Sequence, residues 1–189
     1  MWFSPIKGHY PSLGQLDKTL PVQSGNETIE RGMVLEMVND DVNADGAFKI
    51  AATAAEGKLL YVSLQDYTDA QAGMAGTTGF DADVPSHTEG NITIPGVKAQ
   101  VPTVTGLSLD MEGEYETDAF KDITEAAKIG DGLTVANGFF KLASGGDTVV
   151  AYLTGKPYTR WINNAAAKSA GNKVVRQGAN KTVIRFRTK

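Results

Sequence analysis

The chain has 189 residues and a formal net charge of −4, with 41% hydrophobic and 21% charged residues. This composition predicts a folded protein of one large domain or two small ones, and it differs from that of a disordered chain. The absence of cysteine excludes disulfides, thiolate metal sites and cysteine nucleophiles, and only two histidines are present.

Residues 1–25 are predicted to form an extended N-terminal arm. Three prolines in this segment forbid a continuous helix. Apolar side chains nevertheless recur along it, which is unusual for a solvated tail; among them are Trp2, Phe3 and Tyr10. We therefore expect the arm to lie on an apolar surface, either on the core of this chain or on a partner.

Short apolar runs separated by turn residues indicate a β body over residues 26–155. Its strand-rich sub-units cover about 30–66 and 107–155, and a loop rich in Gly, Ala and Thr, residues 67–106, lies between them. Clusters of Asn, Asp and Gly supply the turns, and Asn137-Gly138 is a strong hairpin signal. The 21 glycines also favour β structure with tight turns.

The clearest periodicity runs over residues 107–119, where apolar and acidic side chains alternate. A period of two predicts one long half-buried strand. Its polar face carries Asp110, Glu112, Glu114, Glu116 and Asp118. Apolar residues at helical spacing then predict a short helix over 118–129 that ends at Gly130.

Two segments of the body resemble each other. Residues 46–51, GAFKIA, match residues 138–143, GFFKLA, and each segment stands between two predicted strands. This similarity predicts two related three-strand units that build one barrel or sandwich. The alternative is a chance similarity between two hairpin-rich stretches.

Residues 156–189 are predicted to form a basic C-terminal arm, with one short helix over 157–171 and a terminal strand or extended end. They contain nine basic and no acidic residues, whereas residues 1–155 contain nine basic and 22 acidic ones. We hypothesise that the basic arm neutralises the acidic strand, in its own subunit or in a neighbour. The alternative is two independently solvated surfaces.

No catalytic or cofactor-binding motif is evident in the sequence. Glycines at positions 73, 76 and 79 match neither a P-loop nor a dinucleotide fingerprint, and we predict a non-enzymatic protein with no cofactor and no metal site. The basic arm lacks a nucleic-acid-binding motif and the acidic remainder would repel a polyanion, so we expect no direct nucleic-acid contact. No apolar run approaches the about 20 residues of a transmembrane helix, so we expect no membrane contact either.

The strand-turn-strand segments resemble those of a known class of proteins. Residues 30–66 and 128–155 contain GMVL before GAFKIA, then GLTV before GFFKLA and the valine-rich run TVVAYL. They resemble virion proteins of tailed bacteriophages, in particular capsid decoration or cement proteins. The resemblance implies a small β-barrel with extended arms, made in the host bacterial cytoplasm, that binds the outer capsid surface and stabilises the head by bridging capsomers. The implied partners are the major capsid protein and neighbouring copies of the chain in a homo-trimer.

Aromatic and arginine side chains are the usual anchors of protein interfaces. The predicted interface residues are therefore Trp2, Phe3, Tyr10, Trp161, Arg176, Arg185 and Arg187, with Asp110, Glu112, Glu114 and Glu116 as an electrostatic contact face. Two alternatives stay open. One is another phage assembly component, such as a tail, head-completion or fibre-base protein, and the other is an enzyme or carbohydrate-binding domain with a site in loop 67–106 lined by Tyr67, Phe80 and His87.

Overall fold

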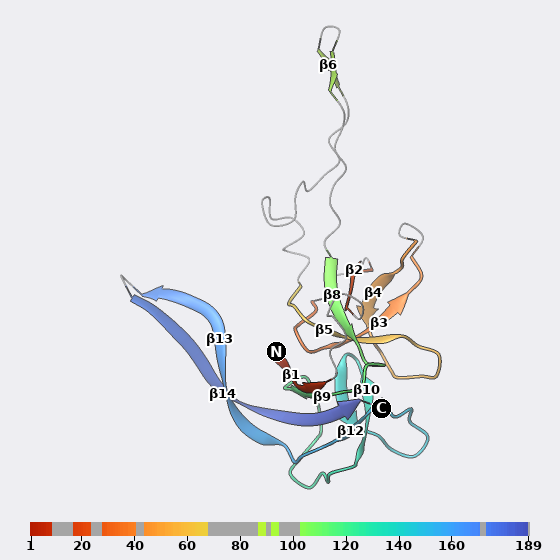
Figure 1. The fold of residues 1–189 in the computed structure, drawn as a ribbon, viewed down its shortest axis with the longest axis vertical. Coiled ribbons are helices and arrows are strands. Elements are labelled where there is room, and N and C mark those ends of the chain that lie inside the picture. The colour runs from red at the N-terminus through yellow and green to blue at the C-terminus, as the bar shows by residue number, and fades with distance from the viewer. Residues whose placement is uncertain are drawn as a thin grey trace.

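The computed structural model describes residues 1–8, 17–23, 28–40, 44–67, 87–89, 92–94, 103–170 and 173–188. These residues are mostly β, as the sequence predicts. They form two antiparallel sheets of seven and five strands and a separate pair of short strands, β6 (His87–Glu89) and β7 (Ile92–Ile94). Figure 1 shows the two sheets next to each other in the body of the molecule.

The five-stranded sheet closes into a small barrel. Its strands, in spatial order, are β2 (Asp17–Pro21), β8 (Thr103–Ser108), β5 (Leu60–Ser63), β3 (Val34–Val38) and β4 (Ala47–Ile50). The two ends of the sheet meet where Val22 forms a parallel bridge to Phe48. There the amide of Gln23 donates a hydrogen bond of 2.8 Å to the carbonyl of Phe48.

Two aromatic rings fill the interior of this first barrel. The centroids of Phe48 and Tyr61 are 5.1 Å apart. Gly106 faces Tyr61 and the ring of Phe48: a Cβ added there would lie 2.9 Å from the Cβ of Tyr61 and 3.0 Å from the ring of Phe48. A residue without a side chain on β8 therefore makes room for a large one on β5.

Five strands of the larger sheet form a second barrel with the same plan. In spatial order they are β9 (Gly113–Thr117), β14 (Lys173–Thr188), β12 (Ala151–Leu153), β10 (Gly132–Ala136) and β11 (Phe139–Leu142). Closure again uses a parallel bridge, from Phe120 to Phe140. The ring that packs on Phe140 comes from Phe186, with centroids 4.7 Å apart, while the register places Ala151 where the first barrel has Tyr61.

The two barrels are copies of one structural unit. In chain order the first uses β2, β3, β4, β5 and β8, and the second uses β9, β10, β11, β12 and β14, with the same neighbours in each sheet. Individual hydrogen bonds coincide as well. The amide of Gly32 donates to the carbonyl of Ser63 at 2.8 Å, and the amide of Gly130 donates to that of Leu153 at 2.8 Å. The repeated GAFKIA and GFFKLA segments are equivalent hairpin strands of two related units. Each unit contains five strands, however, instead of the predicted three, and the units form two barrels instead of one.

One hydrophobic cluster joins the barrels. It contains interior residues of the second barrel, such as Phe140, Phe186 and Leu133, together with Val34 and Val62 from the first. Val34 and Val62 alternate with the interior residues of their own strands, so they point out of the first barrel. The outer face of one barrel therefore packs on the other.

The N-terminal segment belongs to both sheets as far as it is described. β1 (Phe3–Gly8) pairs with β9, and β2 pairs with β8. Phe3 is fully buried and stacks on Tyr115 at 5.4 Å. Residues 1–8 and 17–23 thus follow the alternative in which the predicted arm covers the core of its own chain.

Three local predictions are wrong. Residues 118–129 form bends and turns instead of a helix, because Asp122 has a φ of 58° and the carbonyl of Ala119 and the amide of Lys121 both bond to Phe140 of β11. The predicted single strand over 107–119 is broken by a turn between β8 and β9. Residues 157–171 lie mainly in a strand, β13 (Tyr158–Ala170), because its backbone pairs with β14.

Gly32 and Gly130 occupy equivalent positions in the two barrels but differ in how closely other atoms surround them. Gly32 has a φ of +96° and Gly130 a φ of +91°. A Cβ at Gly32 would lie 2.9 Å from Oγ1 of Thr117 and 3.1 Å from the carbonyl oxygen of Trp2, whereas nothing lies within 4 Å of one at Gly130. We expect Gly130→Ala to cost about 1 kcal/mol of unfolding free energy from backbone strain alone, and Gly32→Ala about 3 kcal/mol. Urea unfolding of the two variants measures the difference; equal losses would contradict the crowding.

Candidate interaction surface

A long hairpin leaves the body between the fourth and fifth strands of the second barrel. β13 pairs with the first part of β14, from Tyr158 opposite Val183 to Ala170 opposite Lys173, with an irregularity between Asn163 and Ala167. Figure 1 shows this hairpin, in blue, extending away from both barrels. Among the described residues β13 pairs with no strand except β14. We call residues 158–183 the basic hairpin, because their charged residues are all Lys or Arg.

The root of the basic hairpin is fixed by a buried carboxylate on the outer face of β9. Glu116 is fully buried. Its oxygens accept hydrogen bonds from the hydroxyl of Tyr158, from the Arg160 guanidinium and, at 2.8 Å, from Nη2 of Arg185. Arg185 lies directly opposite Glu116 in the β14–β9 pair, whereas Tyr158 and Arg160 reach it from β13. Three donors therefore compensate one buried charge.

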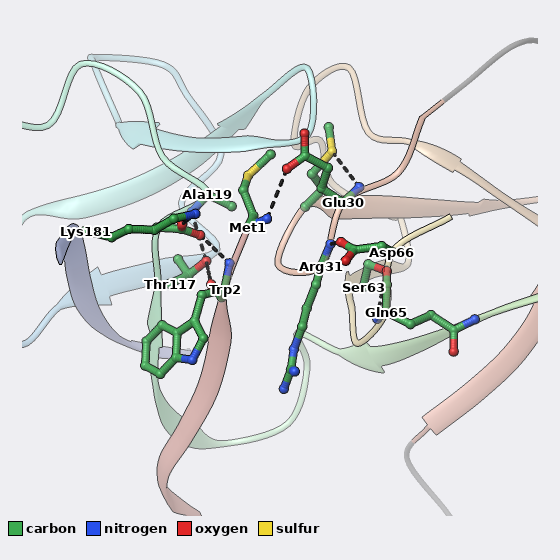
Figure 2. Close-up of polar contacts among 12 residues, drawn as sticks. Met1, Trp2, Glu30, Arg31, Ser63, Gln65, Asp66, Thr117, Ala119 and Lys181 are labelled. Carbon is green, nitrogen blue, oxygen red and sulfur yellow. Dashed lines mark hydrogen bonds and ion pairs between the residues drawn. The ribbon is translucent and has the colours of Figure 1, made fainter. Parts of the chain in front are cut away.

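A second carboxylate ties the hairpin to the N-terminal strand. Asp118 accepts a hydrogen bond from the main-chain amide of Trp2 and forms an ion pair with Lys181, whose Nζ lies 2.6 Å from its carboxylate. The hydroxyl of Thr117 donates to the carbonyl of Trp2 at 3.0 Å, and the Arg160 guanidinium lies 4.7 Å from the Trp2 ring centroid. Figure 2 shows Trp2, Thr117 and Lys181 meeting at this point. We call Glu116 and Asp118 with their partners the root cluster.

The other acidic residues of the row are more exposed. Glu114 accepts a hydrogen bond of 2.7 Å from Thr154, and Glu112 pairs with Arg187, with both side chains of this pair at least 60% exposed. Asp110 is exposed and lines a pocket of about 170 Å³ that also contains Lys58 and Val149. Burial, assisted by the charge of Asp110, raises the pKa of Tyr61 in the first barrel.

The basic C-terminal segment therefore pairs with the acidic strand inside one chain, as one form of the sequence hypothesis states. Arg185 contacts Glu116, and Arg187 contacts Glu112, which directly precedes β9. These contacts follow from alternation, because the acidic residues in and before β9 and the basic residues of β14 share the outer face. Whether this face also contacts another molecule stays a prediction.

The predicted aromatic anchors lie in different environments. Trp2 is half-buried at the hairpin root, and Phe3 is inside the core, so its side chain is not a surface anchor in this fold. Trp161 is 59% exposed on β13, and its ring covers the backbone of Gly178, where an added Cβ would collide with it. Arg176 lies opposite Ala167 in the distal part of the hairpin. Tyr10 lies outside the described residues.

Sequence reasoning did not select Asp118, Tyr158, Arg160 or Lys181 of the root cluster as interface residues. Tyr158 and Arg160 reach Glu116 only because β13 folds back along β14, whereas Lys181 reaches Asp118 from β14 itself. The usable signal was the alternation of basic residues at 181, 185 and 187 near the C-terminal end, which matches the period of the acidic strand. The position of Tyr158 and Arg160 could not be derived once residues 157–171 were expected to be helical.

Asp147 gives the fold a pH-sensitive turn. Hydrogen bonds from the amide and then the hydroxyl of Ser144 hold the pKa of Asp147 below its usual range, with a smaller contribution from Lys141. Because the folded pKa is lower than the unfolded one, ionisation stabilises the fold above about pH 4, and this contribution disappears as the pH falls through the folded pKa.

We therefore expect the melting temperature of the wild type to fall more steeply than that of Asp147→Asn between about pH 5 and 3. Thermal unfolding followed by circular dichroism measures the two slopes. Glu125→Gln, which changes an exposed carboxylate, is the control and should keep the wild-type slope. Equal slopes for all three proteins would contradict the assignment.

In the part of the chain that the structure describes, no three acidic or histidine residues converge to hold a metal ion. Nor do these residues include a helix of the length and apolar character needed to span a membrane. No protein-family model matches the chain, and no curated protein or solved structure compared with it matches either. The interpretation of function therefore depends on the geometry and on the sequence resemblance.

Proposed function

We propose that this chain is a non-enzymatic structural protein of a tailed-bacteriophage virion, a decoration or cement protein. It would bind the outer capsid surface, with the major capsid protein and neighbouring copies as partners, and stabilise the head by bridging capsomers. The observation that carries the proposal is a long hairpin joined by an ionic root cluster to two barrels that share one hydrophobic cluster. A protein that links neighbouring subunits needs a stiff body and a reaching element of this kind.

Two further observations support the proposal. The segments that resemble decoration proteins, residues 30–66 and 128–155, contain the equivalent hairpin units of the two barrels. The basic hairpin also presents Trp161, a large exposed aromatic residue of the type that dominates interfaces. Repetition of modest contacts over a shell would give high avidity.

Co-sedimentation with capsids tests the proposal. Capsids of the virus that encodes the chain, purified without it, should bind the protein to saturation at a fixed number of copies per capsomer and then withstand higher temperature. Trp161→Ala should weaken capsid binding at least about tenfold, whereas Tyr152→Ala, which changes another exposed aromatic residue, should leave it unchanged. A protein that binds no capsid but is recovered with purified tails would support the other phage assembly component instead.

A further inference from the structure

The distal part of the basic hairpin contains positively charged residues and no negatively charged ones. Residues 163–178 contain Lys168, Lys173 and Arg176 and no acidic residue. The acidic partners at the root, Glu116 and Asp118, are already bonded to Arg160, Lys181 and Arg185. Residues 163–170 and 173–178 belong to strands that extend away from the two barrels, as Figure 1 shows.

A hairpin of two strands is marginally stable in water by itself. Its outer backbone edges also present unpaired donors and acceptors, which natural proteins usually cover or protect. Among the described residues β13 pairs with β14 alone. The root cluster fixes the base of the hairpin, which lowers the entropic cost of docking it.

The charge distribution indicates what the hairpin docks on. Residues 1–155 contain 13 more acidic than basic residues, whereas residues 156–189 contain nine basic residues and no acidic one. Two copies placed side by side in the same orientation would bring like charges together. A head-to-tail arrangement instead brings the basic hairpin of one copy to the acidic barrels of the next.

We propose that the distal half of the basic hairpin, residues 163–178, binds the acidic barrel surface of a second copy of this chain. The contact is heterologous, so each copy both gives a hairpin and receives one. Such contacts close into a ring when the rotation between copies allows it. The inference needs nothing from the capsid role, because it concerns the purified protein in solution.

Light scattering of the purified full-length chain tests the proposal. The wild type should form a defined oligomer near 50 mM salt and dissociate toward the monomer near 1 M salt, because the Debye length falls from above 10 Å to about 3 Å. Lys168→Glu/Lys173→Glu/Arg176→Glu should raise the dissociation constant at least about a hundredfold. The control Arg31→Glu/Lys128→Glu/Lys156→Glu makes the same charge change at exposed positions outside residues 163–178 and should keep the wild-type mass.

A capping experiment tests the head-to-tail geometry. A variant in which residues 164–177 are replaced by a two-residue turn keeps the root cluster and should be a monomer. Because its barrels can still receive a hairpin, adding it in excess to the wild type should convert the wild-type oligomer into complexes that contain one copy of each. An unchanged wild-type mass after mixing would overturn the head-to-tail contact.

Polyanion binding is the competing outcome. Fluorescence anisotropy with a labelled DNA duplex distinguishes it: the proposal expects no binding near 150 mM salt, because the acidic barrels repel phosphates. A wild type that is monomeric at every salt concentration, or a hairpin charge variant that retains the wild-type mass, would overturn the proposal. DNA binding that is lost in the same variant would assign the hairpin to nucleic acid instead.

Discussion

Glu116→Gln is expected to destabilise the protein by about 3 kcal/mol, because it removes a buried charge that pairs with two arginines at the hairpin root. Glu116 is fully buried, whereas Arg160 and Arg185 are 44% and 40% exposed, so solvent relieves part of the penalty and the loss stays at the lower end for a buried ion pair. In urea this corresponds to a midpoint lower by about 1 to 2 M.

Glu112→Gln is the matched control. Glu112 lies in the same acidic row and also pairs with an arginine of β14, but its side chain is 70% exposed. Its loss should cost no more than about 0.5 kcal/mol, as for other surface ion pairs. Similar losses in the two variants would mean that burial adds nothing to the root cluster.

Hydrogen exchange separates loss of the root from loss of the whole fold. In Glu116→Gln the amides of residues 158–162 should exchange faster, because the substitution removes the charge and one of the two acceptor oxygens that hold Tyr158 and Arg160. The amides of β3 in the first barrel should keep their wild-type protection, measured under conditions where both proteins are folded. A uniform rise across the chain would show that Glu116 supports global stability and does not orient the hairpin.

The sequence predicted best those features that are encoded locally. The Asn137-Gly138 turn, the paired GAFKIA and GFFKLA strands and the mostly β architecture all follow from short-range periods and turn chemistry. The pairing of basic and acidic residues across β14 and β9 was also accessible, because both segments alternate with a period of two.

The features that were missed depend on long-range pairing. Residues 118–129 have helical spacing, but tertiary bonds to Phe140 remove the backbone groups that a helix would use. The barrel closure through Val22 and Phe120 joins strands distant in sequence, so no local pattern announces it. Tertiary pairing therefore overrode propensity at these positions.

The two barrels share one strand order, but the large side chains that fill their interiors come from different strands. This difference gives the second large prediction. The register makes Tyr61 equivalent to Ala151, and Gly106 equivalent to Phe186. Each barrel thus has one large and one minimal residue at these two positions, in opposite order. The ring packed on Phe48 comes from β5, whereas the ring packed on the equivalent Phe140 comes from β14.

Tyr61→Ala alone should cost about 3 to 5 kcal/mol, because it leaves a cavity beside Phe48. Gly106→Phe alone should be at least as harmful, because its ring would need the space beside Phe48 that the Tyr61 ring occupies. The double variant Tyr61→Ala/Gly106→Phe gives the first barrel the arrangement of the second. It should therefore be more stable than either single variant, with a favourable coupling of about 3 kcal/mol or more.

A double-mutant cycle of urea unfolding free energies measures this coupling. Tyr61→Ala/Gly32→Ala is a control pair, since Gly32 faces Thr117 and Trp2 on the outside of the Phe48–Tyr61 pair, and its losses should add. If Gly106→Phe fails to fold, Gly106→Val with and without Tyr61→Ala keeps the test, because valine overpacks the same space less severely. Additive losses in both cycles would mean that the first barrel cannot adopt the interior packing of the second. The two barrels would then share their strand order but not their way of packing side chains.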